Sequence, residues 1–152
     1  MTRRLRESRG FTLVEMAVVI LLLGIIAAFS VPAYMKLNRS LQLKGATQNV
    51  AGQLQLARQK AMATGKPQMM HFHADAGNVD YHIHNAGEGP TGGWKLPKNV
   101  VCNWSLGGVL PSQEVQLNPN GRAYRSGYVI LQTIGGLRDT VKVLLSGLVL
   151  TQ

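Results

Sequence analysis

Apolar residues are unevenly distributed, and the longest apolar stretch lies near the start of the chain. Residues 11–34 are apolar or glycine apart from Thr12, Glu15, Ser30 and Pro32. A helix rises about 1.5 Å per residue, so about 20 residues cross the hydrocarbon core of a bilayer. The stretch 11–34 therefore predicts one membrane-spanning helix.

The next segment, residues 35–65, changes to the pattern of an amphipathic helix. Apolar residues recur there at spacings of three and four: Leu43, Ala46, Val50, Leu54, Ala57 and Ala61. This period predicts that the same helix continues to Thr64 and buries one face. Gly65 is suited to a left-handed cap, and Pro67 follows it, so the helix should end there.

From residue 66 onward the apolar period becomes two, which is typical of strands. Met70 and Phe72 should share one face of a strand, and Tyr81 and Ile83 one face of the next. Further short apolar runs, separated by turn residues, continue to residue 150. The expected fold class is α+β, with a long N-terminal helix, membrane-spanning in its first half, and a small antiparallel β-sheet or sandwich head at 66–152.

Charge adds an orientation to this picture. Residues 1–10 hold four arginines against Glu7, a net charge of +3, directly before the apolar run. Basic residues on one flank of a membrane helix favour the cytoplasmic side. The other residues carry 12 basic and 6 acidic side chains, an excess that is weak evidence for nucleic-acid binding. The single cysteine, Cys102, has no intramolecular disulfide partner and is expected as a buried small apolar residue or a free thiol.

Glu15 is the unexpected residue of the apolar stretch, because a carboxylate in hydrocarbon is costly and usually functional. A secretory signal does not explain it, since such signals have an uncharged apolar region and a clear small-residue cleavage site. A plain membrane anchor accounts for the length of the stretch but not for Glu15.

A third interpretation comes from the segment "RGFTLVEMAVVILLLGIIAAFSVPAY". It resembles the N-terminus of the type IV pilin superfamily, whose signature is G-F-T-L-x-E. The resemblance implies that a prepilin peptidase cuts after Gly10 and removes residues 1–10 as a leader. Phe11 then becomes the N-methylated first residue, and Glu15 the fifth. Residues 11–34 would form the membrane or filament-core part of the helix.

The physical chemistry of such a filament gives Glu15 a role. Where the helices bundle, the α-amino group of one subunit's Phe11 and the Glu15 carboxylate of its neighbour can neutralise each other. The attraction is strong where water is absent, and pairing removes the cost of an isolated charge. Glu15 is therefore predicted to set the register of assembly.

The remainder of the chain narrows the resemblance. The segments "NVAGQLQLARQKAMATGKP", "LPKNV", "VQLNPNGRAYRSGYVIL" and "VKVLLSGLV" resemble, in this order, the GspH/FimT subgroup of minor pilins. This implies a minor pseudopilin or pilin that assembles at or near the tip of a periplasmic type II secretion pseudopilus or type IV pilus. The expected partners are other minor and major pilins or pseudopilins, a prepilin peptidase and methylase, and the inner membrane. The expected location is a single pass of the inner membrane with the C-terminal head in the periplasm.

The alternative is a DNA-binding minor pilin for DNA uptake. Aromatic and basic residues could serve such a surface: Trp94, Trp104, Tyr124, Tyr128, Arg122 and Arg125. However, some FimT-type pilins that bind DNA carry Gly-Arg-x-Arg in the last hairpin. Residues 147–150 here read Gly-Leu-Val-Leu, so nucleic-acid binding is not expected.

Four histidines are the remaining candidates for chemistry: His71, His73, His82 and His84. If the hairpin pairs 73 with 82 and 71 with 84, all four lie on one face, opposite Phe72, in a geometry that zinc or copper accepts. A register shifted by two residues would offset them diagonally. The favoured interpretation is a solvent-facing set of histidines, so no metal or cofactor is expected. The sequence also contains no G-x-S-x-G or phosphate-loop motif, and it is not expected to be an enzyme.

Overall fold

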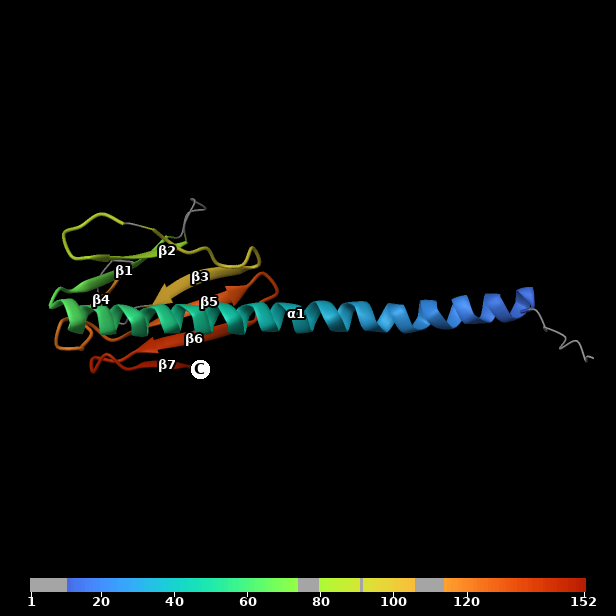
Figure 1. The fold of residues 1–152 in the computed structure, drawn as a ribbon. Helices are drawn as coiled ribbons and strands as arrows, with labels where there is room; N and C mark the ends of the chain where they lie inside the picture. The colour runs from blue at the N-terminus through green and yellow to red at the C-terminus, as the bar shows by residue number, and fades with distance from the viewer. Residues whose placement is uncertain (1–10, 74–79, 91, 106–113) are drawn as a thin grey trace, which may run out of the picture. The chain divides into compact units, whose positions relative to one another are not determined.

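The computed structural model describes residues 11–73, 80–90, 92–105 and 114–152, with the side chains of 103–105 left out. The chain divides into two compact units, residues 1–37 and residues 38–152. A single helix, α1 (Leu13–Thr64), contributes to both units (Figure 1).

Helix α1 begins two residues later than the predicted start and ends at the predicted residue. The helix continues through Pro32 without interruption. At its end Gly65 has a φ of 67°, and its N–H donates to the Ala61 carbonyl at 3.0 Å. Glycine adopts this left-handed conformation without a Cβ clash, so the predicted cap is confirmed.

The part of α1 in the first unit has an apolar surface that the protein does not cover. It contains a stretch long and apolar enough to cross a membrane, and none of that stretch is buried within the protein. Bare apolar surface of this extent requires lipid or other chains around it. That residues 11–34 span a membrane stays a prediction, with which this exposed apolar surface is consistent.

The second unit contains two antiparallel sheets (Figure 1). The first sheet has the order β2-β1-β4 and consists of β1 (Gln68–Phe72), β2 (Tyr81–Asn85) and β4 (Glu114–Leu117). The second sheet has the order β3-β5-β6-β7 and consists of β3 (Val100–Ser105), β5 (Gly127–Thr133), β6 (Arg138–Val143) and β7 (Val149–Thr151). The predicted α+β class is confirmed.

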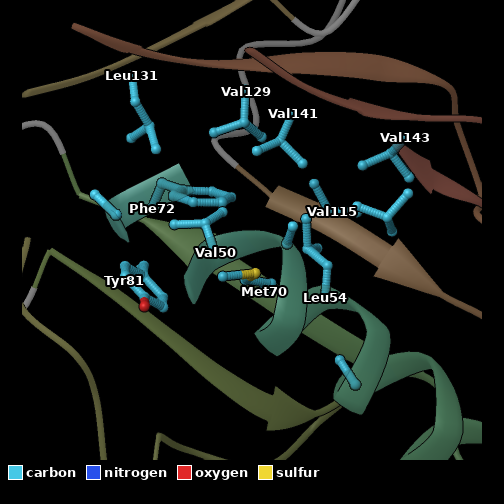
Figure 2. Close-up of a cluster of buried hydrophobic side chains, with 14 of the residues drawn as sticks. Val50, Leu54, Met70, Phe72, Tyr81, Val115, Val129, Leu131, Val141 and Val143 are labelled. Atoms are coloured by element: carbon cyan, nitrogen blue, oxygen red, sulfur yellow. The ribbon is translucent and has the colours of Figure 1, made fainter. Parts of the chain in front are cut away.

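One hydrophobic core joins the second half of α1 to both sheets. All six apolar positions of the predicted helical stripe are buried, together with Thr47 and Ala51. Figure 2 shows Val50 of the helix beside Phe72 of the first sheet, with Leu54 of the helix and Val129 of the second sheet in the same cluster. Burial of each large apolar side chain contributes about 1.5–3 kcal/mol relative to exposure, so this contact holds the second unit together.

A second contact joins α1 to two tight turns. The Arg58 Nε donates a hydrogen bond to the Gly121 carbonyl oxygen at 2.7 Å. Gly121 and Gly147 each have a φ of 76°, and a Cβ added to Gly147 would overlap that same carbonyl oxygen. The β6–β7 turn can therefore approach the 118–121 turn only because residue 147 is glycine.

We expect residues 38–152 to fold as a soluble domain without the apolar half of α1. Their core is complete within this unit, since the helix stripe and both sheets belong to it. The isolated fragment should give a circular dichroism spectrum of mixed helix and strand and one cooperative thermal transition. A disordered or purely helical spectrum would contradict this expectation.

We also expect Gly147→Ala to destabilise this fragment more than Gly136→Ala. Both glycines have positive φ, but a Cβ at Gly136 meets no atom within 4 Å. The control should lose about 1–2 kcal/mol from left-handed strain alone. Gly147→Ala should lose about 1–3 kcal/mol more, the usual cost of overpacking. Urea denaturation measures both, and equal losses would show that the turn contact contributes nothing.

Candidate assembly site at the start of helix α1

The candidate processing and assembly residues lie where helix α1 begins. Gly10, the predicted cleavage position, lies outside the described residues. Phe11, the predicted new N-terminus, precedes the helix and is exposed. Glu15 lies in the first turn of α1. The structure thus places Phe11 and Glu15 within one helical turn of each other, on accessible surface.

Glu15 takes part in a capping box with Thr12. The Glu15 N–H donates to the Thr12 Oγ1 at 3.1 Å, and the Thr12 N–H donates to the Glu15 Oε2 at 3.2 Å. The Thr12 hydroxyl also donates a hydrogen bond to the same Oε2, at 3.3 Å. These reciprocal bonds satisfy two backbone donors that have no partner within the helix.

The role of Thr12 was not predicted, although the signal was present in the T-x-x-E spacing. Ser or Thr followed three residues later by Glu, before an apolar run, is the usual pattern for a helix start. A carboxylate in the first turn is also stabilised by the positive end of the helix dipole. Glu15 is therefore locally stabilised before any partner is considered.

The capping box leaves Glu15 able to bind a cation. A carboxylate has two oxygens with about four acceptor positions between them. The two donors from Thr12 both point at Oε2. An ammonium group can approach the same carboxylate without displacing the cap, so the geometry allows the predicted pairing with a neighbour's N-terminus.

The four histidines lie on one face of the first sheet, and the register is the alternative one, shifted by two residues. The expectation that all four face solvent is wrong for His82, which is buried. Strands β1 and β2 pair His71 with His82 and Met69 with His84, two residues away from the assumed pairing. The opposite face of these strands holds buried Phe72 and Tyr81. A shift of two residues preserves the faces because side chains alternate with period two.

These four residues, His71, His73, His82 and His84, are called the histidine cluster below. Their rings stack with centroid separations of 4.8–5.4 Å. His73 Nε2 and His82 Nδ1 share a hydrogen bond of 2.9 Å, and His71 Nε2 lies 3.4 Å from Glu114 Oε2. In the described part of the chain, no three His, Cys, Asp or Glu side chains are arranged to hold a metal ion.

Among the described candidates for an aromatic and basic surface, Trp94 differs from the two tyrosines in its exposure. Trp94 is half-buried and stacks on Tyr81 with a centroid distance of 5.5 Å. Tyr124 and Tyr128 are exposed instead, and each lies close to a cation. The side chain of Trp104 lies outside the described residues.

Cys102 lies half-buried against the core as a free thiol. Burial raises the pKa of this thiol to about 12. It is therefore protonated at neutral pH and unsuited to nucleophilic or redox chemistry, which requires the thiolate.

Comparisons with known proteins bear on the N-terminal segment and on the fold. The family model of the prokaryotic N-terminal methylation motif matches residues 5–31. No curated protein sequence matches the chain.

Solved structures with the same fold are found among minor pilins and pseudopilins. The minor pseudopilin EpsH from the type 2 secretion system of Vibrio cholerae is similar with a TM-score of 0.58 and 12% identity, over 73% of this chain and 96% of that one. The type IV minor pilin FimU of Pseudomonas aeruginosa is similar with a TM-score of 0.59 and 11% identity, over 74% of this chain and 90% of that one.

The methylation motif covers the apolar start of α1, and the structural likeness covers most of the chain. The motif match concerns the N-terminal segment, and the structural likeness concerns the fold, a helix followed by antiparallel sheets. The chain therefore carries the prokaryotic N-terminal methylation motif and has the fold of minor pilins and pseudopilins.

Proposed function

We propose that this protein is a minor pseudopilin or minor pilin that assembles at or near the tip of a type II secretion pseudopilus or type IV pilus. One observation carries the proposal. The methylation motif coincides with an uncovered apolar helix whose first turn presents a carboxylate. A helix of this kind is suited to membrane storage followed by transfer into a helical bundle.

Processing would come first. Residues 1–10 hold the four arginines of the leader, and their charge favours the cytoplasmic side of the inner membrane. A prepilin peptidase would cut after Gly10 there, and methylation would follow at Phe11. Residues 11–34 would then cross the inner membrane once and leave the C-terminal head in the periplasm.

Assembly would use the two charges at the helix start. In a bundle of apolar helices, the α-amino group of a neighbouring subunit's Phe11 would otherwise be an isolated charge. The exposed Glu15 carboxylate can neutralise it while retaining its bonds to Thr12. An unpaired charge of this kind costs several kcal/mol, so only one register of the helices would be favourable.

The proposed partners are other minor and major pilins or pseudopilins, together with the prepilin peptidase and methylase. DNA uptake is the less favoured alternative. The two exposed tyrosines with nearby cations would suit it. However, leucines occupy both positions of the last hairpin, 148 and 150, where DNA-binding relatives carry arginine.

We predict that the mature protein begins at Phe11. Intact-mass analysis of protein extracted from membranes should show loss of residues 1–10 and the gain of one methyl group. Replacement of Gly10 by a bulky residue should leave the full-length chain, as an internal control. Retention of Met1 in cells with an active prepilin peptidase would contradict the proposal.

We further predict that Glu15→Gln and Glu15→Leu both impair filament assembly strongly, Glu15→Leu slightly more, with both proteins still inserted in the membrane. Gln preserves the capping box, because Gln also serves at this position, whereas Leu removes it. Both lose the charge, which leaves the neighbour's ammonium unpaired at a cost of about 3–5 kcal/mol. Loss of the cap alone would cost about 1 kcal/mol.

The measurement is co-purification of each variant with the other filament subunits after cross-linking in membranes. Thr12→Ala is the matched control, since it weakens the cap and keeps the carboxylate. If Glu15→Gln assembles like the native protein while Thr12→Ala does not, Glu15 acts through the helix cap and the charge-pair mechanism is wrong.

A further inference from the structure

The histidine cluster is independent of the helix start, and the proposed assembly function does not use it. The chain has four histidines in total, and all belong to this cluster. His71 lies on β1, His82 and His84 lie on β2, and His73 directly follows β1, so the second sheet contains none. A response that depends on histidine should therefore be confined to the first sheet.

The geometry supports one row of side chains across all three strands. Register pairs His82 of β2 with His71 of β1, and His71 with Glu114 of β4. His73 and His84 stack diagonally against this row. Strand β1 is central, and β2 is an edge strand bonded to it on one side.

We propose that the histidine cluster makes the first sheet sensitive to protonation, so that mild acid loosens β2 from β1 while the second sheet stays closed. Two acidic residues of the described part of the chain adjoin the cluster: Glu114 contacts His71, and Asp80, whose backbone carbonyl accepts from the His73 N–H, directs its carboxylate to the Leu96 N–H. Glu114 lies 3.4 Å from His71 and can compensate one positive charge. Further protons would place like charges on rings whose centroids are about 5 Å apart.

The hydrogen bond between His73 and His82 sets a second limit on protonation. One ring nitrogen must donate and the other accept across the 2.9 Å separation. The first proton can be accommodated on the donor ring. When both rings are protonated, two N–H groups face each other and the bond is lost. His82 is 9% exposed, so water gives little compensation.

The pKa directions agree with this geometry. Burial is the main cause that lowers the pKa of His71, with Glu114 opposing it and His84 and His73 adding to it. Burial also comes first in lowering the pKa of His82, followed by the neighbouring histidines. The folded state therefore binds fewer protons than the unfolded state just below pH 6.5, the ordinary histidine value.

The sign of the effect follows from this difference. Stability of the first sheet is full above about pH 6.5. It decreases as pH falls through that value toward the lowered folded-state pKa values, and the loss is complete below them. The inner face of the same strands carries Phe72 and Tyr81 of the core. Opening of β2 would expose Tyr81 and separate it from Phe72, its partner on β1, whereas Trp94 bridges to the outer edge of β2.

The test is hydrogen exchange of the full chain in detergent micelles, read by mass spectrometry at pH 7 and pH 5 with a chelator present. After correction for the intrinsic pH dependence of exchange, amides of β1 and β2 should exchange several-fold faster at pH 5. Amides of β5 and β6 should change little. An equal change in both sheets, or no change in either, would overturn the proposal.

Two variants with opposite expected effects sharpen the test. His82→Gln removes the most buried imidazole and should reduce the acid-dependent change in β1 and β2. Glu114→Gln removes the compensating anion next to His71 and should enlarge it. Each variant is compared with its own pH 7 protection, so a general loss of stability does not imitate the result. A smaller acid response in Glu114→Gln would also overturn the proposal.

Discussion

The second half of helix α1 is the constraint on which the rest of this fold depends. The two sheets are small and have separate strand orders, so neither can bury its apolar face alone. The helix supplies a narrow stripe of alanine, valine and leucine that covers both. Small residues such as Ala46 and Ala57 let the strands approach the helix closely, and Val50 and Leu54 fill the space between them. The same helix in its first half has no such cover, so one element joins a soluble core to a surface suited to lipid or neighbouring helices.

Most of this organisation could be predicted from the sequence because it follows from local periodicity. A period of three and four residues identified the helix stripe, and Gly65 identified its end. A period of two identified the inward residues, including Phe72 and Tyr81. The β1–β2 register could not be obtained in this way, because a shift of two residues leaves every side chain on the same face. The pairing of β4 with β1 is a long-range contact that no local pattern encodes.

In the candidate sites, too, contacts between residues close in sequence could be predicted, and contacts between distant segments could not. Thr12 lies three residues before Glu15, so the spacing alone predicts its capping role. Only the charge of Glu15 entered the prediction from sequence. Glu114 could not have been linked to the histidines from sequence, because β4 lies more than 40 positions beyond β1. The contact of Arg58 with Gly121 is similar, since it joins two segments that are 63 positions apart in the sequence. Each unexpected contact depends on which strands become neighbours.

The capping box changes how the cost of Glu15 in an apolar segment should be counted. An isolated carboxylate in hydrocarbon loses all of its hydrogen bonds to water. Here Thr12 supplies two donors, and the first turn of α1 adds its dipole, so part of that loss is recovered within a single subunit. The remaining deficit is the uncompensated charge, which only a cation can remove. In the proposed function, a subunit with such a helix start could remain in the membrane as a monomer. Its Glu15 carboxylate would be stabilised further by contact with a neighbour's N-terminal ammonium. In the proposed assembly, the local cap and the intermolecular pair would be successive steps in stabilising the same carboxylate.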